Sequence, residues 1–166
     1  MRGITRRELL SAEEWVGSSP LVWRRAYPGR KEQVAIARRF AKSLFAAGHC
    51  GEAVGFAVSE LATNALRHTR SGQIDGGWFG VEIIDDDPVY VAVTDLGGDK
   101  VPVLWPESVG DQFREHGRGL RALSTMAIAL GIHGSPALGH TVWVDLDPLA
   151  DLDGGAADQK GALLVV

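Results

Sequence analysis

Three polar residues recur at four-residue intervals within the segment Gly51–His68: Glu60, Asn64 and His68. The same segment has apolar residues at helical spacing, which predicts an amphipathic helix with the three polar side chains in a line beside its apolar stripe. A Glu and an Asn one turn apart can direct a general base and a neutral oxygen ligand toward one point, as Mg²⁺-assisted phosphoryl transfer requires. The alternative is an ordinary solvated helix face, which this segment alone leaves open.

A carboxylate followed by glycines is the second pattern with chemical potential. The apolar run Val91–Thr94 ends at Asp95, and Leu96-Gly97-Gly98 follows. A carboxylate fixed at the mouth of a pocket can accept a hydrogen bond from the exocyclic amine of adenine, and glycines beside it let the backbone approach the ring. Guanine has an oxygen at that position, so the carboxylate would discriminate against it. An ordinary Asp-Gly turn explains the same residues equally well.

A third pattern, Glu115–Leu120, combines glycines with His116 and Arg118 before an apolar helix. Glycine at a helix entrance exposes backbone N–H groups, and the N-terminal end of a helix favours anions. Arg118 or His116 can add charge-assisted hydrogen bonds to a terminal phosphate. A flexible loop end is the alternative explanation. Thr141, near the start of the last expected strand, would face this pocket if its apolar neighbours along the strand face the core.

The elements that must position these residues alternate irregularly along the chain. Hydrophobic periodicity and turn residues predict four strands, at Leu21–Tyr27, Trp78–Ile84, Val89–Thr94 and Gly139–Leu146. Helices are predicted to follow Arg30, ending before Gly48, and to span Gly51–His68 and Leu120–Leu130. The first strand is expected at a sheet edge, and the stretch Leu96–Gly117 is expected to be a long loop. This order favours an α+β two-layer sandwich over a regular βαβ array.

Length and composition fit one globular domain. The chain has 166 residues, 45% of them hydrophobic and 23% charged, which excludes global disorder. We expect residues 20–148 to form the domain, residues 1–19 a flexible N-terminal arm and residues 149–166 a disordered tail. The net charge of -4 gives no electrostatic reason to expect a nucleic acid or a membrane as partner. Cys50 is the only cysteine, and no long apolar run or signal peptide is visible, so we expect a soluble cytoplasmic protein.

The order of these patterns resembles a known family. E-x-x-x-N on a helix, D-x-G after a strand, G-x-G-L opening a helix and G-x-T in the last strand occur together in the ATP-binding domain of the GHKL superfamily, which includes gyrase and sensor histidine kinases. The resemblance covers Leu21–Asp147 and is most specific in Val58–His68, which is similar to the N box. Val93–Gly98 resembles the first glycine box and Gly117–Leu120 the second. The resemblance implies the Bergerat fold, a two-layer α/β sandwich whose mixed, mostly antiparallel sheet is covered on one face by helices.

Within that superfamily the chain is most similar to the stand-alone bacterial anti-sigma-factor serine/threonine kinases of actinobacterial type. The resemblance implies that Glu60 is the general base for a serine hydroxyl, that Asn64 binds Mg²⁺ and that Asp95 binds the adenine amine. The other residues implied to contact ATP are Gly97, Gly98, His116, Gly117, Arg118, Gly119, Leu120 and Thr141. The loop Asp99–His116 would be the ATP lid. Asp99 departs from the D-x-G-x-G pattern at the second glycine, which affects the expected lid geometry more than adenine binding.

The resemblance implies an ATP-Mg-dependent serine/threonine kinase that regulates transcription by partner switching. Such a kinase binds a sigma factor and phosphorylates a STAS-type anti-anti-sigma protein, and a homodimer is implied by analogy. A second hypothesis is an ATP-responsive binding module without kinase activity, in which the nucleotide orders the lid. A third, a detached histidine-kinase catalytic domain, is disfavoured because no helical hairpin with a phosphoacceptor histidine is visible. The histidines His49, His116, His133 and His140 fall in expected loops or turns.

Overall fold

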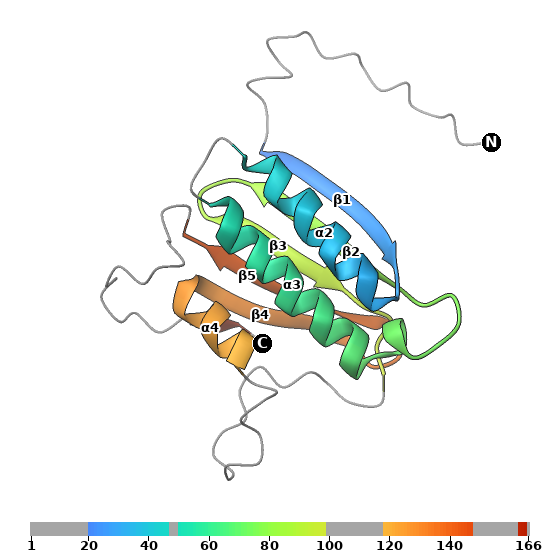
Figure 1. Cartoon of the computed structure of the whole chain (residues 1–166). Coiled ribbons are helices and arrows are strands. Elements are labelled where there is room, and N and C mark those ends of the chain that lie inside the picture. The colour runs from blue at the N-terminus through green and yellow to red at the C-terminus, as the bar shows by residue number, and fades with distance from the viewer. Residues whose placement is uncertain (1–19, 47–49, 99–117, 148–162, 166) are drawn as a thin grey trace, which may run out of the picture.

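The computed structural model describes residues 20–46, 50–98, 118–147 and 163–165. The strands in this part of the chain are β1 Leu21–Pro28, β2 Trp78–Asp85, β3 Val89–Thr94, β4 Ala127–Ser135, β5 Gly139–Leu146 and β6 Leu163–Val165. The helices are α2 Lys31–Leu44, α3 Gly51–His68 and α4 Arg118–Met126, with a short 3₁₀ turn, η1, at Arg70–Gly72. All three α-helices lie on one face of a single sheet (Figure 1), so the predicted two-layer α+β sandwich is confirmed.

The sheet brings the end of β3 next to the start of β5. Its strand order is β1-β2-β3-β5-β4-β6, and every neighbouring pair is antiparallel except β4 and β6, which run parallel. Strand β1 lies at an edge, as predicted. In the β3–β5 register Val93 pairs with Val142 and Thr94 pairs with Thr141. The residues that follow β3 therefore lie beside the turn that connects β4 to β5.

Helix α3 packs closely on the sheet because its buried face consists mainly of small residues. Alanine and valine recur at helical spacing along this face, and the buried residues of α3 are Gly51, Ala53, Val54, Gly55, Ala57, Val58, Leu61, Ala62 and Ala65. They form one core with the helix-facing side chains of the sheet, among them Phe79, Ile83 and Val91. At Gly55 an added Cβ would lie 2.6 Å from Cγ of Lys42, so glycine at this position allows α2 to pack tightly against α3.

One predicted helix is wrong at its C-terminal end. The apolar spacing favoured a helix over Leu120–Leu130, but α4 ends at Met126 and the chain continues directly into strand β4. In that strand Leu130 pairs with Val144 and Ile132 pairs with Val142, so their side chains join the core through the sheet. Long-range pairing with β5 thus overrides a spacing that suits either structure.

One histidine and the C-terminal end also differ from expectation. His133 lies in β4, although it was predicted in a loop or turn, whereas His140 lies in β5, the strand predicted over Gly139–Leu146. Residues Leu163–Val165 form strand β6 beside β4, whereas a disordered tail was expected over 149–166; the remainder of that tail and the arm at 1–19 lie outside the described residues. None of the helices in the described part of the chain combines the length and hydrophobicity that a membrane-spanning segment requires.

Candidate functional site

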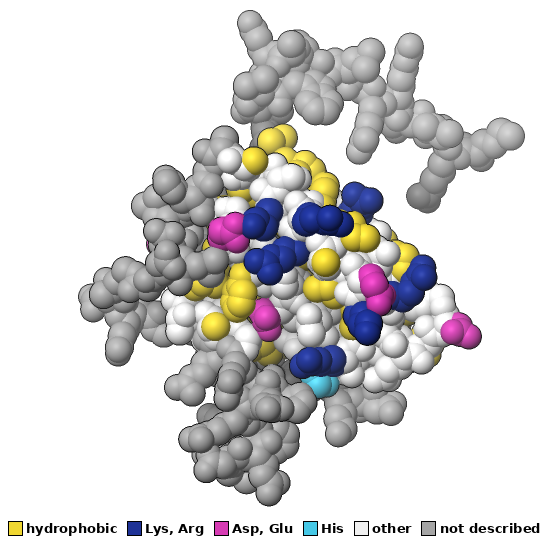
Figure 2. All heavy atoms as spheres, in the orientation of Figure 1, with side chains coloured by type: hydrophobic (Ala, Val, Ile, Leu, Met, Phe, Trp, Pro, Cys, Tyr) yellow, Lys and Arg dark blue, Asp and Glu magenta, His cyan; other side chains and the backbone are white. Residues whose placement is uncertain are grey.

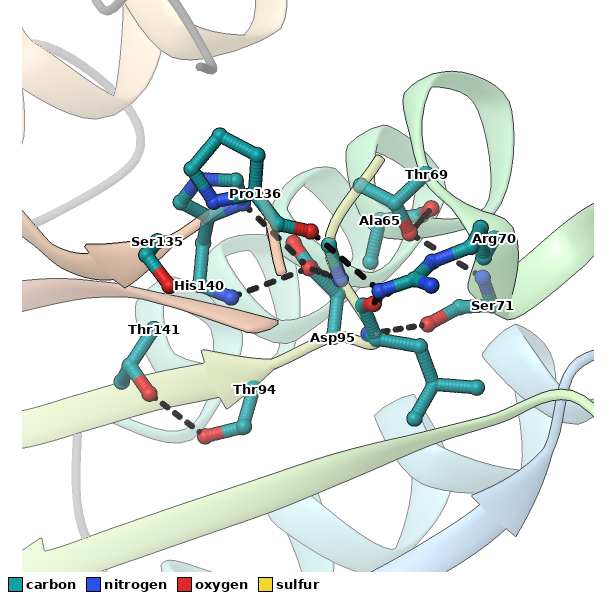
Figure 3. Close-up of polar contacts among 12 residues, drawn as sticks. Ala65, Thr69, Arg70, Ser71, Thr94, Asp95, Ser135, Pro136, His140 and Thr141 are labelled. Carbon is teal, nitrogen blue, oxygen red and sulfur yellow. Dashed lines mark hydrogen bonds and ion pairs between the residues drawn. The ribbon is translucent and has the colours of Figure 1, made fainter. Parts of the chain in front are cut away.

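Asp95 is a buried carboxylate held by backbone amides. It follows β3 directly and is only 3% exposed. Its Oδ1 accepts hydrogen bonds from the N–H groups of Gly97 (2.6 Å) and His140 (3.1 Å), and its own N–H donates to the carbonyl of His140 (2.8 Å) (Figure 3). Two amide donors on one oxygen fix the orientation of the carboxylate. Asp95 is therefore a preorganised hydrogen-bond acceptor, as the predicted recognition of an amine requires.

The loop that carries Asp95 contacts the β4–β5 turn through backbone atoms. Gly97 has a φ of +71° and Gly139 a φ of +106°, conformations that side chains disfavour. An added Cβ at Gly97 would overlap the carbonyl of Pro136, and one at Gly139 would overlap the carbonyl of Asp95. These two glycines let the loop and the turn approach each other more closely than any side chain would allow.

Thr141 hydrogen-bonds to a residue that the sequence analysis did not single out. Its hydroxyl lies 2.8 Å from that of Thr94, directly across the β3–β5 pair. The neighbouring Val142 and Val144 belong to the core, so strand alternation directs Thr141 toward the sheet face opposite the helices. The structure therefore brings Thr141 to Thr94 rather than to the Asp95 carboxylate, and its role in adenine binding stays a prediction.

The side chain that lies beside Asp95 is His140. It is 1% exposed, and its Nδ1 lies 3.6 Å from Oδ1 of Asp95. Neither ring nitrogen has a hydrogen-bond partner within the described part of the chain. Buried polar groups are normally paired, so an unpaired imidazole next to a fixed carboxylate marks this position as unusual. In the sequence, His140 is marked only as the variable residue of the G-x-T pattern, whose threonine is the residue that indicates function.

Glu60 and Asn64 lie on α3 with part of each side chain accessible, and Glu60 faces the beginning of α4. Glu60 contacts Gly119 so closely that an added Cβ there would overlap its carboxylate. Two segments that the sequence analysis grouped only by resemblance, the N-box-like helix and the second glycine pattern, therefore meet in space. His68 is exposed at the C-terminal end of the same helix.

The other predicted residues are placed in part. Gly98 donates its N–H to the carbonyl of Pro136 (3.2 Å), and an added Cβ would come within 3.3 Å of the His68 carbonyl. Leu120 packs partly buried against the core, and Arg118 is the first residue of α4. The remaining predictions, namely His116, Gly117, Asp99 and the lid Asp99–His116, lie outside the described residues.

A shallow cavity of about 420 Å³ lies elsewhere on the molecule. It is lined by the turn between β1 and α2 and by the segment that precedes β2, namely Pro28, Gly29, Arg30, Gly72, Gln73, Ile74, Asp75, Gly76 and Gly77. None of these residues belongs to the constellation around Asp95 and Glu60. The candidate site is therefore defined by its polar side chains and close backbone contacts and not by this cavity.

Comparison with known proteins decides the family. The sequence profile of the histidine kinase-like ATPase domain matches residues 27–145, which include Glu60, Asn64, Asp95 and Gly119. The chain belongs to this family. The match agrees with the GHKL resemblance and with the observed fold. No curated protein sequence matches the chain significantly.

Histidine kinase-like ATPase domains bind ATP, usually with Mg²⁺, and the residues of this chain fit such a ligand. Asp95 offers a fixed acceptor for an amine, and Gly119 leaves free the space beside Glu60 that a Cβ would fill. Asn64 offers one amide oxygen, which suits Mg²⁺ because this ion retains several waters and binds phosphate oxygens. Among the described residues no cluster of three or more His, Cys, Asp and Glu side chains could hold a metal alone.

Proposed function

We propose that the chain is an ATP-Mg-binding serine/threonine protein kinase of the anti-sigma-factor type. The contact between Gly119 and Glu60 carries this proposal. It brings a carboxylate to the beginning of α4, where backbone N–H groups and the helix dipole favour phosphate oxygens. A base beside a phosphate-binding helix end is the arrangement that phosphoryl transfer to a hydroxyl needs.

Each residue of the site has one role in this proposal. Bound Mg-ATP supplies the phosphoryl group that is transferred. Asp95 accepts a hydrogen bond from the adenine amine, Asn64 binds Mg²⁺, and Glu60 accepts the proton of a serine hydroxyl on the partner protein. The amides at Gly119 and at the residues before it hold the phosphates. Catalysis then rests on positioning and on charge neutralisation.

The proposed partners are a sigma factor and a STAS-type anti-anti-sigma protein, with a second copy of the chain as a further partner. The surface of β1 and α2 supports a protein partner of acidic character. Residues 21–44 contain seven Lys or Arg residues and a single acidic residue, Glu32. Figure 2 shows cationic side chains spread over the helical face of the molecule. Arg24 pairs with Glu82, and Arg38 and Lys42 pair with Glu52, so the attraction for an acidic partner would come mainly from Arg25, Arg30, Lys31 and Arg39.

Phosphate transfer from labelled ATP-Mg to a STAS-type protein tests the proposal. We expect Glu60→Gln to reduce the transfer rate at least 100-fold, the usual range for loss of a general base, and to change ATP affinity less than threefold. Glu52→Gln is the matched control, because Glu52 lies on the same helix but is exposed and pairs with Lys42 and Arg38. It should transfer phosphate at the wild-type rate.

Three outcomes separate the hypotheses. Undiminished transfer by Glu60→Gln would remove Glu60 as the base. ATP binding by the wild-type protein without transfer to any STAS-type partner would favour the ATP-responsive binding module over the kinase. Transfer to a histidine of a partner protein would favour a detached histidine-kinase catalytic domain.

A further inference from the structure

The segment that follows α3 forms a rigid turn at the base of the Asp95 loop. Thr69 is 1% exposed; its hydroxyl donates to the carbonyl of Ala65 (2.6 Å) and accepts from the N–H of Ser71 (3.2 Å). Ser71 is fully buried and begins the turn of η1 together with Arg70. Because these bonds anchor the turn to the last turn of α3, the position of Arg70 is fixed relative to the helix that carries Glu60 and Asn64.

This turn binds the Asp95 loop through main-chain and side-chain groups. The N–H of Arg70 donates to the carbonyl of Gly97 (2.7 Å), and the N–H of Leu96 donates to Oγ of Ser71 (2.9 Å). The Arg70 guanidinium adds two bonds to the carbonyl of Leu96, from Nε at 3.0 Å and from Nη2 at 2.6 Å. Both residues that follow Asp95 are therefore held by Arg70 and Ser71 (Figure 3).

The same guanidinium reaches the β4–β5 turn. Its Nη2 also donates to the carbonyls of Pro136 (3.2 Å) and Ala137 (3.1 Å), which are 66 and 67 residues away along the chain. The carbonyl of Pro136 accepts the N–H of Gly98 as well. One planar side chain thus joins three segments: the end of α3, the loop after β3 and the turn before β5. The two amides that hold the Asp95 carboxylate come from this loop (Gly97) and from the start of β5, directly after the turn (His140).

We propose that Arg70 is a positioning residue for adenine recognition: by clamping the Asp95 loop to the β4–β5 turn it orients the Asp95 carboxylate and sets the preference for adenine over guanine nucleotides. This inference rests on the proposed function of Asp95. The guanidinium suits the task because it is flat, always charged and has several donors in a fixed geometry, which lysine lacks. Arg70 is exposed, so water can replace its bonds to the carbonyls without collapse of the core. Its loss should therefore loosen the loop more than it destabilises the fold.

The experiment compares wild-type protein, Arg70→Gln and Arg70→Lys, with Arg67→Gln as the matched control. Arg67 is also an exposed arginine at the C-terminal end of α3, and its side chain makes no bond to residues 95–98, the described part of the Asp95 loop. Amide hydrogen exchange without nucleotide reports on the loop, titrations with ATP-Mg and GTP-Mg report on the preference, and thermal unfolding reports on the fold. We expect Arg70→Gln to accelerate exchange at Leu96, Gly97 and Gly98 at least tenfold and to weaken ATP binding about tenfold. GTP binding should change less than threefold, so the ATP preference falls.

Arg70→Lys should behave like Arg70→Gln, and Arg67→Gln like the wild type. Wild-type exchange rates and ATP preference in Arg70→Lys would overturn the proposal, because a positive charge without the guanidinium geometry would then be enough to hold the loop. If Arg70→Gln weakened ATP binding and GTP binding equally and also lowered the unfolding temperature, Arg70 would have only a stabilising role and the proposal would be overturned. Absence of ATP binding by the wild-type protein would overturn the proposed function and the adenine part of this inference. The exchange rates would then still decide whether Arg70 holds the loop.

Discussion

Two glycines with nearly the same positive φ provide a matched test of the packing around Asp95. Gly97 has a φ of +71° and Gly76 a φ of +72°. At Gly76 an added Cβ has no atom within 4 Å, whereas at Gly97 it overlaps the carbonyl of Pro136. Replacement by alanine therefore forces a side chain into a positive φ at both positions and causes a steric conflict at only one.

The magnitudes follow from this difference. Alanine in the left-handed region costs about 1–2 kcal/mol, and the entropy that alanine removes from the unfolded chain is the same for both variants. At Gly97 the β4–β5 turn must also move away from the new methyl group, and such overpacking costs about 1–3 kcal/mol more. We expect Gly76→Ala to lower the free energy of unfolding by about 1–2 kcal/mol and Gly97→Ala by about 2–5 kcal/mol.

Urea denaturation of the wild type and both variants measures these differences, and ATP titration accompanies it. Because the displaced turn leads directly into β5, whose His140 N–H holds Asp95, Gly97→Ala should also weaken ATP binding, whereas Gly76→Ala should not. Equal destabilisation by both variants would refute the close backbone contact between the loop and the turn. Stronger destabilisation by Gly76→Ala would refute it as well.

Two further predictions concern Gly119 and Cys50. Gly119→Ala should slow phosphate transfer at least tenfold, because the new methyl group displaces the Glu60 carboxylate. The stability of the protein should not fall, since the end of the Glu60 side chain is flexible and alanine favours the helix. A wild-type transfer rate in this variant would contradict the contact between Gly119 and Glu60. Burial, with the nearby Asp85 and Asp147, raises the pKa of the Cys50 thiol from 9.0 to about 11. The thiol of the unfolded chain loses its proton at a lower pH than the thiol of the folded chain. The stability that the buried, protonated Cys50 contributes is therefore fully present below pH 9 and is lost as the pH rises to 11. The loss should reach about 2–3 kcal/mol. Unfolding measurements on the wild type and Cys50→Ala between pH 8 and 11 isolate this difference, and parallel curves for the two proteins would contradict it.

Local sequence patterns predicted most elements of the fold. Helix α3 and strands β3 and β5 have the predicted bounds, because their apolar residues repeat at helical or alternating spacing and turn residues flank them. Strand β4 was not predicted, because Leu123, Ala127 and Leu130 have the spacing of one face of a helix. Only its long-range pairing with β5 decides the structure. Strand β6 likewise depends on pairing with β4, which no local pattern reveals.

The sequence predicted the main side chains of the site but not the residues that hold them. Asp95 and Glu60 stand out by residue type and spacing. Arg70 does not, because its acceptors are carbonyls 26, 66 and 67 residues away and carbonyls carry no sequence signal. His140 was missed for a related reason: its proximity to Asp95 arises from the β3–β5 register. Residues whose partners are backbone groups far away along the chain can be identified only from the three-dimensional structure.

Calorimetric titration of ATP-Mg into three proteins tests whether Asp95 belongs to an adenine-nucleotide site. The proteins are the wild type, Asp95→Asn and Asp75→Asn, the last being an exposed carboxylate that lines the separate cavity. We expect saturable binding to the wild type and to Asp75→Asn, with affinity at least tenfold weaker for Asp95→Asn because a charged acceptor is lost. Equal affinity of the wild type and Asp95→Asn, or no binding by the wild type, would contradict it.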